Sequence, residues 1–520
     1  MTGRLPSATA RGKALRRDIA ALGIAASCET ADLWAASRDC SAAALLWTKA
    51  RVAPHPPDVV AWPEDAEQVS ALIRYAMQHR VPVVPSGSGT GVSGGAVAVR
   101  GGICLDTKRL TQPLRIDLPE RAVETGAGVS GNRLEEMLGG SGATLGHRPE
   151  SGGTVGGWLA TRSAGTLSTR YGCIAQMVLS LEAVDGTGQI LRTLDGPCGG
   201  PDLAQLLLGS EGTLAVFTSA RLRIWPRPAK PWVRAVRFAS LAHALRAARE
   251  VLRAGLRPST VRIEDGLDTL LSSTGPLPVP QPLKWLVEGA QAEALRLSLR
   301  APLLLNRLAE ALPSGSLLVL GFEADSGEEA EAEGQAALAL CAQGNGSDAG
   351  EATGQRSLAA AARAGWAQAP LFAAGAYVEN LDFATTWDRA ESLYRAIRRA
   401  VEGLAFVRGH FGHATAEGCA LEIALIGIAG AAADDVAFAS PEDAEEDLEE
   451  GERRRDAACA AALSAAADEG ATISHHRGVG ASRQVALRRE LGEGMRQLRA
   501  LKQAFDPHGI LNRGRLYPEF

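Results

Sequence analysis

The chain has 520 residues and eight cysteines, but no two of the cysteines form a CxxC pair, so we expect neither an iron–sulfur cluster nor a zinc site. It has no apolar run of about 18 residues, the length that a membrane-spanning helix needs. Residues 1–17 are polar and basic, unlike a signal peptide. Lysine and arginine are scattered and the formal charge is −5, which argues against nucleic-acid binding. We therefore expect a cytoplasmic protein.

The composition is that of a large globular protein. Hydrophobic residues make up 46% of the chain and charged residues 22%, which is typical of folded rather than disordered sequences. A chain of this length exceeds one typical domain, so two domains with separate cores are expected. We detect no internal repeat.

The most informative stretch is Val81–Val97, VPVVPSGSGTGVSGGAV, with glycine at five of the nine positions from Gly87 to Gly95. Glycine permits positive φ and close approach of the backbone to a ligand, so consecutive N–H groups can form a concavity for phosphate oxygens. The preceding segment is expected to be strand Val59–Trp62, helix Pro63–Arg80 and a second strand. The stretch matches neither GxGxxG nor GxxxxGK[ST], which disfavours an ordinary Rossmann or NTPase loop.

Two more glycine-rich tracts follow. Gly146–Gly172 leads into an expected strand, Met177–Val184, and Gly209–Leu214, GSEGTL, precedes the expected strand Ala215–Ile224. Three such loops beside β segments indicate one extended site for a phosphate-bearing cofactor rather than three unrelated turns.

The order of these loops resembles the FAD domain of flavoenzymes of the vanillyl-alcohol oxidase type. Four further segments resemble the alkyldihydroxyacetonephosphate synthase branch of that family: Gly156–Gly172, Ala384–Arg389 (ATTWDR), Ser474–Gly480 (SHHRGVG) and Leu501–Leu516. The resemblance covers roughly residues 54 to 516. D-lactate and glycolate dehydrogenases share much of this scaffold, so the substrate motifs are less specific than the cofactor motifs.

The resemblance implies an α+β fold: a two-part FAD-binding domain of the vanillyl-alcohol oxidase/PCMH type with an α+β cap and a C-terminal helical return. We place an N-terminal helical segment at 1–50, the FAD domain at 51–226, the cap at 227–455 and the returning segment at 456–520. The cap is expected to be a mixed sheet with helices on one face. We further expect a loop and a solvated helix in 326–354, a solvent-facing helix in 441–456, and one helix in 483–505 that ends at Asp506-Pro507.

The cofactor is expected to be FAD bound without a covalent link, because family members that tether the flavin through the first loop use a histidine there, and Ser86–Gly95 contains none. The resemblance implies these FAD-binding residues: Pro85, Ser86, Gly87, Ser88, Gly89, Thr90, Gly91, Ser93, Gly94, Thr154, Gly156, Gly157, Thr161, Arg162, Ser163, Gly165, Tyr171, Gly172, Glu211, Gly212, Ala215 and Phe217.

Few residues suggest a substrate site. The chain has nine histidines, four of them in two pairs, His410 with His413 and His475 with His476, and neither pair has the HExxH spacing of a metal site. An imidazole titrates near neutral pH, so these side chains can donate hydrogen bonds, carry protons or satisfy buried carbonyls.

The match to the synthase branch is incomplete at the substrate residues. Where the family has a third histidine, an arginine and an acid/base tyrosine, this chain has Arg477, His410 and Glu422. Arg262 lies where the family has an active-site arginine, although an ion pair with Glu264 or Asp265 is an equal alternative. We therefore predict His475, His476, Arg477, Arg262, Glu422 and His410 as catalytic residues, and no metal.

Two chemistries remain open from the sequence: the resemblance implies the synthase reaction first, with an oxidoreductase as the alternative. A synthase would replace the acyl group of an acyl-dihydroxyacetone phosphate by a fatty alcohol through a flavin N5 adduct, with no net redox change. An oxidoreductase would oxidise a D-2-hydroxy acid or similar alcohol by hydride transfer to the flavin. Either substrate is a small phosphorylated or carboxylated anion, which Arg262 and Arg477 are predicted to bind. We expect a homodimer without nucleic-acid partners, with peripheral membrane contact if the substrate is a lipid.

Overall fold

The computed structural model describes residues 5–149, 152–196, 199–266, 295–311, 315–363, 368–429 and 441–517. The chain divides into two compact units. The first comprises Met1–Ala164, Gly172–Arg227 and His476–Phe520, and the second comprises Gly165–Tyr171 and Pro228–His475. The boundary placed at 455/456 from the sequence falls inside helix α19 (Pro441–Asp468), and the second unit continues to His475.

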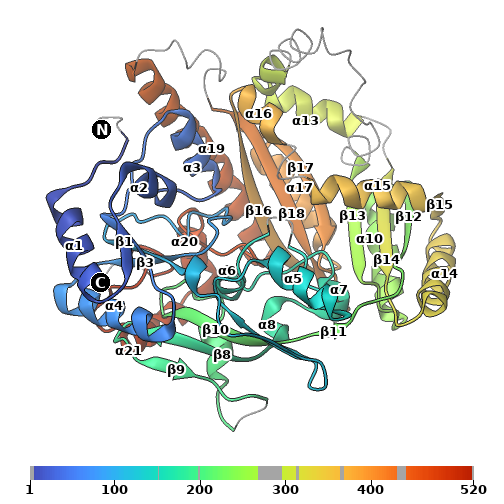
Figure 1. Cartoon of the computed structure of the whole chain (residues 1–520). Helices are drawn as coiled ribbons and strands as arrows, with labels where there is room; N and C mark the ends of the chain where they lie inside the picture. The colour runs from blue at the N-terminus through green and yellow to red at the C-terminus, as the bar shows by residue number, and fades with distance from the viewer. Residues whose placement is uncertain are drawn as a thin grey trace, which may run out of the picture. The chain divides into compact units, whose positions relative to one another are not determined.

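The first unit mixes short helices with strands (Figure 1). Its helices are α1 (Ala10–Ala21), α2 (Thr30–Ala36), α3 (Ala42–Lys49), α4 (Ala66–His79), η1 (Thr107–Arg109), α5 (Gly131–Gly140), α6 (Val155–Thr161), α8 (Ile174–Met177), α9 (Leu203–Leu207), α20 (Gln484–Leu491) and α21 (Gly494–Phe505). Its strands are β1 (Ala25–Ser27), β2 (Val59–Trp62), β3 (Val83–Ser86), β4 (Ile103–Asp106), β5 (Leu114–Asp117), β6 (Ala122–Gly126), β7 (Ala143–Thr144), β8 (Val178–Asp185), β9 (Ile190–Arg192), β10 (Ala215–Arg223) and β11 (Trp225–Pro226).

Helix α4 shows how the local sequence sets the fold. Asp65 caps it by accepting from the Gln68 amide at 2.8 Å, so the helix starts later than the expected Pro63. Val69, Leu72 and Ile73 lie at helical spacing and are fully buried. They pack in one core with residues of β2, β3 and β4.

Two sheets organise the first unit. One has the order β1-β2-β4-β3, with β2, β4 and β3 parallel, and the other is antiparallel with the order β5-β6-β10-β8-β9. The C-terminal tail adds to the first sheet, because Val83 donates to Ile510 O at 2.9 Å and accepts from the Asn512 amide at 2.8 Å. The tail therefore lies beside the strand that leads into the glycine-rich loop.

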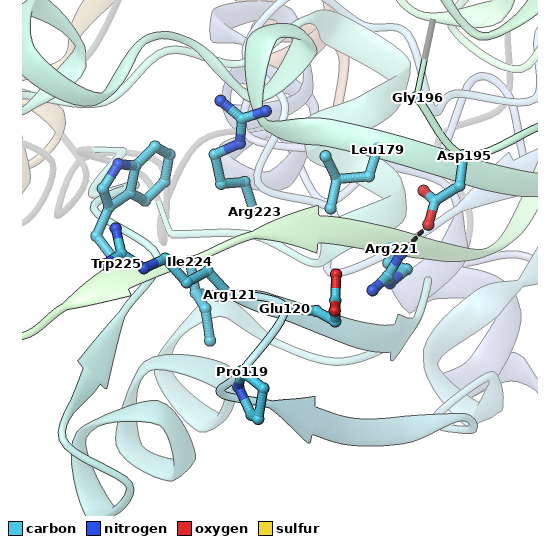
Figure 2. Close-up of a pocket in the computed structure, with 10 residues that line it drawn as sticks. All are labelled: Pro119, Glu120, Arg121, Leu179, Asp195, Gly196, Arg221, Arg223, Ile224 and Trp225. Carbon is cyan, nitrogen blue, oxygen red and sulfur yellow. Dashed lines mark ion pairs between the residues drawn. The ribbon is translucent and has the colours of Figure 1, made fainter. Parts of the chain in front are cut away.

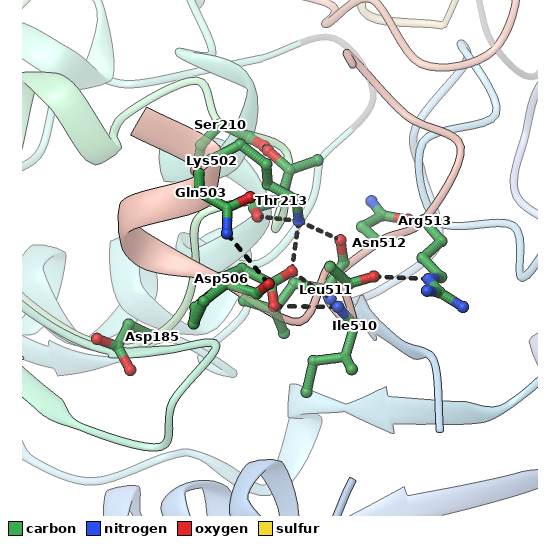
Figure 3. A network of polar contacts seen from close by, with 12 residues as sticks. Asp185, Ser210, Thr213, Lys502, Gln503, Asp506, Ile510, Leu511, Asn512 and Arg513 are labelled. Carbon is green, nitrogen blue, oxygen red and sulfur yellow. Dashed lines mark hydrogen bonds and ion pairs between the residues drawn. The ribbon is translucent and has the colours of Figure 1, made fainter. Parts of the chain in front are cut away.

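A buried ion pair fixes this tail (Figure 3). Lys502 Nζ lies 2.5 Å from Asp506 Oδ2 and also donates to Thr213 O and Leu511 O, at 2.7 and 2.8 Å. Asp506 in turn accepts from the amides of Ile510 and Leu511. Burial lowers the pKa of Lys502, and the charge of Asp506 opposes that shift. The buried ammonium group of Lys502 thus joins the turn after α21 to the third glycine-rich loop, through its contacts with Asp506, Leu511 and Thr213.

The second unit is built on one seven-stranded sheet of order β15-β12-β14-β13-β17-β18-β16 (Figure 1). Its strands are β12 (Trp232–Phe238), β13 (Thr260–Glu264), β14 (Ser316–Phe322), β15 (Ser347–Gly350), β16 (Ala376–Thr386), β17 (Phe406–Gly412) and β18 (Gly418–Ile428). Its helices are α7 (Ser168–Tyr171), α10 (Leu241–Arg253), α13 (Pro302–Ala311), α14 (Gly327–Gln343), α15 (Glu351–Ala362), α16 (Ala369–Ala373), α17 (Ala390–Val401) and α19.

Helices cover both faces of this sheet, not one face as expected. Gly334 of α14 packs on Trp232, whereas Gly354 of α15 packs on Val233, the next residue of the same strand. Neighbouring residues of a strand point to opposite faces, so α14 and α15 lie on opposite sides. The prediction failed because strand and helix patterns do not record which face each helix covers.

Two local expectations change. Residues 326–354 contain a helix as expected, α14, which Ser326 caps, but strand β15 and the start of α15 take the place of much of the expected loop. The single helix expected in 483–505 is two helices, α20 and α21, separated at Gly492, which has positive φ. In the charged part of α19, the exposed residues are Glu445, Glu446, Glu449, Arg453, Arg454 and Asp456, whereas Arg455 packs inward toward Glu379, 4.0 Å away.

Among the described residues, no helix is long and apolar enough to cross a membrane. The homodimer and the peripheral membrane contact remain predictions.

Candidate functional site

The first glycine-rich loop is held to the protein through its carbonyl groups. Gly91 O accepts from the Cys40 amide at 2.8 Å, Gly94 O accepts from Arg515 Nε at 3.0 Å, and Gly95 O accepts from Asn512 Nδ2 at 2.9 Å. By contrast, the amides of residues 88–91 donate to no acceptor in the part of the chain that the structure describes. Four consecutive backbone N–H groups that can donate to a ligand fit the pyrophosphate of a dinucleotide such as FAD.

The third glycine-rich loop and the C-terminal segment support this cradle. Glu211 has a left-handed backbone, with φ of 50°, and its buried carboxylate accepts from the amides of Val479 and Gly480 at 2.6 and 2.9 Å. Burial raises the pKa of Glu211, and the two amide hydrogen bonds oppose that rise. Asn512 also donates to Glu211 O at 2.7 Å, so one asparagine joins the first loop to the third. Neither Asn512 nor Arg515 was expected in this role.

The predicted cofactor residues fall mainly in the first unit. Gly165 and Tyr171 belong to the second unit, where Tyr171 OH donates to Glu323 at 2.8 Å. The first unit contains Pro85, Ser86, Gly87, Ser88, Gly89, Thr90, Gly91, Ser93, Gly94, Thr154, Gly156, Gly157, Thr161, Arg162, Ser163, Gly172, Glu211, Gly212, Ala215 and Phe217.

For some of these positions, contacts within the protein already account for the residue type, without a cofactor. Arg162 donates to Leu208 O and Gln205 O, which fastens helix α9. Gly156 lets α6 approach Ala127, because a Cβ at Gly156 would come within 3.0 Å of the alanine side chain. Gly157 differs, since an added Cβ would meet only Thr154 Oγ1, at 3.4 Å.

This openness makes Gly157→Val a sharp test of cofactor contact. An added Cβ at Gly157 clashes with no described residue outside its own helix, so we expect the valine mainly to displace a ligand that packs against α6. Overpacking a contact costs about 1–3 kcal/mol, which weakens FAD binding by about 5- to 150-fold. We expect the purified variant to lose FAD absorbance while its apo form melts like the apo wild type.

The matched control is Gly140→Val, because Gly140 is also helical and no atom lies within 4 Å of an added Cβ. A Gly157→Val protein that retains its full FAD content would remove Gly157 from the cofactor site.

The second unit contains a row of ionisable residues on one sheet face. Glu264 of β13 is paired with His410 of β17, His410 with Glu422 of β18, and Glu422 with Asp382 of β16. Directly paired residues of adjacent strands have side chains on the same face with Cβ atoms about 5 Å apart. The three carboxylates are all buried. Three buried acids on one face need positive charge or hydrogen-bond donors nearby, and His410, which is paired with both Glu264 and Glu422, supplies one such group.

Glu422 is the centre of this row. Its Oε1 lies 3.5 Å from His410 Nε2 and 3.2 Å from His413 Nε2. His413, just after β17, has a positive φ of 46°, which is unusual for a residue other than glycine. This conformation directs its ring to the same carboxylate as His410. Two imidazoles and one buried carboxylate form a group that can take up a proton.

His475 is part of the same cluster. Its ring stacks on His413 with 5.5 Å between centroids, and its amide donates to Asp382 Oδ2 at 2.8 Å. Burial, and next the facing His413, lower the pKa of His475 below its ordinary value of 6.5. His475 is therefore neutral at neutral pH.

Arg262 lies two residues before Glu264 on the same face of β13, and its Nε donates to Glu264 Oε1 at 3.1 Å. Glu264 also accepts from Ser357 at 2.6 Å. The structure thus contains the Glu264 ion pair that the sequence offered as one alternative, and the binding of a substrate anion by Arg262 stays a prediction. His476 and Arg477 belong to the first unit, where Ser93 Oγ donates to Arg477 O at 3.1 Å.

A separate cavity of about 570 Å³ opens on the five-stranded sheet (Figure 2). Arg121, Arg221, Arg223 and Trp225 are among the residues that line it, and Arg221 is ion-paired with Asp195. None of the residues that line this cavity was predicted as a site residue from the sequence, so we do not place the cofactor or substrate site there.

Comparison with known proteins agrees with the two-part architecture. A family model described as "FAD binding domain" matches residues 57–194, and a model described as "FAD linked oxidases, C-terminal domain" matches residues 227–516, more than half of the chain. The chain belongs to the FAD-linked oxidase family. It is an FAD-dependent enzyme, and the predicted family and fold class are confirmed.

Relatives within the family have different activities. The chain is 38% identical over 200 residues to a D-lactate dehydrogenase of Archaeoglobus fulgidus, covering 38% of this chain and 45% of that one. It is 33% identical over 220 residues to the alkyldihydroxyacetonephosphate synthase of Caenorhabditis elegans (41% and 37%), and 34% identical over 236 residues to that of Trypanosoma brucei brucei (44% and 38%). The matched part spans less than half the length of each of these relatives.

Solved structures match over nearly the whole chain. An alkyldihydroxyacetonephosphate synthase superposes with a TM-score of 0.71 at 20% identity, covering 98% of this chain and 85% of that chain. Substrate-bound p-cresol methylhydroxylase gives 0.70 at 15% identity, covering 98% of both chains. At these identities the similarity shows the fold.

Proposed function

We propose that this FAD-linked oxidase oxidises a small anionic alcohol of the D-2-hydroxy acid type to the corresponding carbonyl compound. The observation that carries the proposal is the buried Glu422 carboxylate with His410 and His413 both within 3.5 Å. Oxidation of an alcohol removes a proton from oxygen and a hydride from carbon, so it needs a group that accepts the proton. The relative from Archaeoglobus fulgidus, a D-lactate dehydrogenase, supports this choice of substrate class.

The residues of the second unit have separate roles in this proposal. The His413–Glu422 pair takes the hydroxyl proton, and the carboxylate stabilises the imidazolium that forms. Neutral His475 keeps a second positive charge away from the face of that ring. Arg262, on the same sheet face, binds the carboxylate of the substrate. Bound FAD, held by the amides of the first loop, would supply the acceptor for the hydride.

Anaerobic flavin spectroscopy tests the proposal. Purified holoenzyme is mixed without oxygen with D-lactate, L-lactate and glycolate in turn, and absorbance of the oxidised flavin is followed. The proposal predicts bleaching by at least one D-2-hydroxy acid or glycolate at a rate that matches turnover. Flavin that stays oxidised with a broad panel of hydroxy acids contradicts it.

The synthase reaction is the second candidate, favoured by the 33–34% identity to two alkyldihydroxyacetonephosphate synthases. Against it, Glu422 and His410 stand where that branch has a tyrosine and an arginine, and these two replacements contact each other. In this chain the two positions hold a carboxylate and an imidazole 3.5 Å apart, without the tyrosine of that branch. Release of fatty acid from acyl-dihydroxyacetone phosphate with a fatty alcohol, and without net flavin reduction, would favour the synthase.

We also propose that FAD is bound without a covalent link, because no histidine lies in residues 86–95. Acid precipitation of the yellow protein is expected to leave the flavin in the supernatant. Colour that stays in the pellet would show a covalent link.

The pH dependence of kcat/KM is expected to report His475. Its pKa is lowered by burial, so the neutral form persists to pH values below 6.5, and protonation of His475 at still lower pH is expected to reduce activity by placing a positive charge beside the base. One step of the acid limb should therefore have an apparent pKa below 6.5. His475→Asn should remove or displace this limb, and an unchanged limb in that variant would exclude His475 as its source.

A further inference from the structure

Ser168 contacts the proton-accepting cluster, although it was not among the site residues predicted from the sequence. It lies in α7, a segment that belongs to the second unit but is 245 positions from His413 along the chain. Its Oγ lies 2.7 Å from His413 Nδ1, while His413 Nε2 lies 3.2 Å from Glu422 Oε1. Both ring nitrogens of His413 thus have a defined partner, one a hydroxyl and the other an acid.

The chemistry of these two partners selects one tautomer. An ionised carboxylate can only accept a hydrogen bond, so it requires the proton of neutral His413 to be on Nε2. Nδ1 then carries the lone pair, and the Ser168 hydroxyl donates to it. We propose that Ser168 is a positioning residue that holds His413 in this Nε2–H tautomer, with its basic nitrogen directed at the serine hydroxyl.

Positioning has a consequence for proton uptake. With Nε2–H donated to ionised Glu422, Nδ1 is the nitrogen of His413 that can take up a proton, and Glu422 balances the charge of the imidazolium that forms. In the other tautomer the Nε2 lone pair would face the carboxylate, and Nδ1 would have no lone pair for that proton.

The backbone of the cluster supports a fixed ring. His413 has a positive φ of 46°, a conformation that persists only where surrounding contacts hold it. Helix α7 is itself fastened to the second unit, since Tyr171 OH donates to the buried Glu323 at 2.8 Å and Arg170 donates to Arg257 O at 3.4 Å. Ser168 is therefore presented from a fixed element and not from a loose loop.

The direct test is the tautomer of His413, read by nitrogen NMR of holoenzyme labelled with ¹⁵N-histidine, with the signals assigned through a His413→Asn variant. We expect one signal set with the proton on Nε2 in the wild type. Ser168→Ala should give mixed tautomers or loss of that pattern, and Ser168→Thr should restore it. The matched control is Thr169→Ala, the next residue of α7. A wild-type proton on Nδ1, or an unchanged pattern in Ser168→Ala, would overturn the inference.

A kinetic measurement completes the test. Unlike the NMR experiment, it rests on the proposed function. Loss of one hydrogen bond of ordinary strength predicts a decrease in kcat of about 2- to 10-fold in Ser168→Ala, with KM unchanged. The solvent deuterium isotope effect on flavin reduction should also change, which a merely structural serine would not cause. If no hydroxy acid reduces the flavin, the proposed function fails while the NMR result still decides the role of Ser168.

Discussion

Glu422→Gln is expected to lower kcat by about 10²- to 10⁴-fold, the usual contribution of a general base. The amide has nearly the same shape but carries no charge, so it can neither stabilise a protonated His413 nor store a proton. Binding of FAD should be unaffected, because Glu422 lies in the second unit and the first and third glycine-rich loops lie in the first. Turnover and the rate of anaerobic flavin reduction, measured at equal FAD loading, give the result.

The matched control is Glu417→Gln, an exposed residue in the turn of the same hairpin. It should retain wild-type kcat. Should Glu422→Gln also keep near-normal flavin reduction, the His413–Glu422 pair is a structural contact and the base lies elsewhere.

Lys502→Met is expected to lower the free energy of unfolding of the first unit by about 3–5 kcal/mol, because it leaves buried Asp506 without its cation. It also removes the hydrogen bonds that Lys502 makes to Thr213 O and Leu511 O, which join α21, the third loop and the tail (Figure 3). The tail in turn holds the carbonyls of the cofactor loop, so FAD should be released at a lower temperature than from the wild type.

Denaturant unfolding, followed by flavin fluorescence, measures both effects. Lys13→Met, at an exposed position of α1, is the control and should change stability little. An unfolding midpoint of Lys502→Met equal to that of the control would show that the ion pair contributes no net stability.

The glycine-rich loops beside strands were predictable because the signal is local. A glycine-rich turn after a strand shows in ten consecutive residues, and the strand Val59–Trp62 was placed with the bounds that the structure has. The residues that support the loop were not predictable in this way. Asn512 and Gly95 are 417 positions apart, and only the pairing of the tail with β3 brings them together.

The residues of the proposed substrate site show the same limit. His410 and Glu422 were predicted because they replace family residues within one hairpin, and the structure pairs them directly. Glu264 and Asp382 join the same row only because the strands follow the spatial order β13-β17-β18-β16, which differs from their order along the chain. Propensity also misjudged 483–505, where a positive-φ Gly492 interrupts an otherwise continuous helical pattern.

In the proposed reaction this chain removes a hydride and a proton from a hydroxy acid. The most direct measurement is anaerobic stopped-flow reduction of the bound FAD by the active hydroxy acid and by the same acid deuterated at C2, with the product quantified. We predict one keto acid formed per FAD reduced, with slower bleaching for the deuterated substrate. Bleaching without keto acid, or fatty-acid release from acyl-dihydroxyacetone phosphate with the flavin oxidised throughout, would contradict the account.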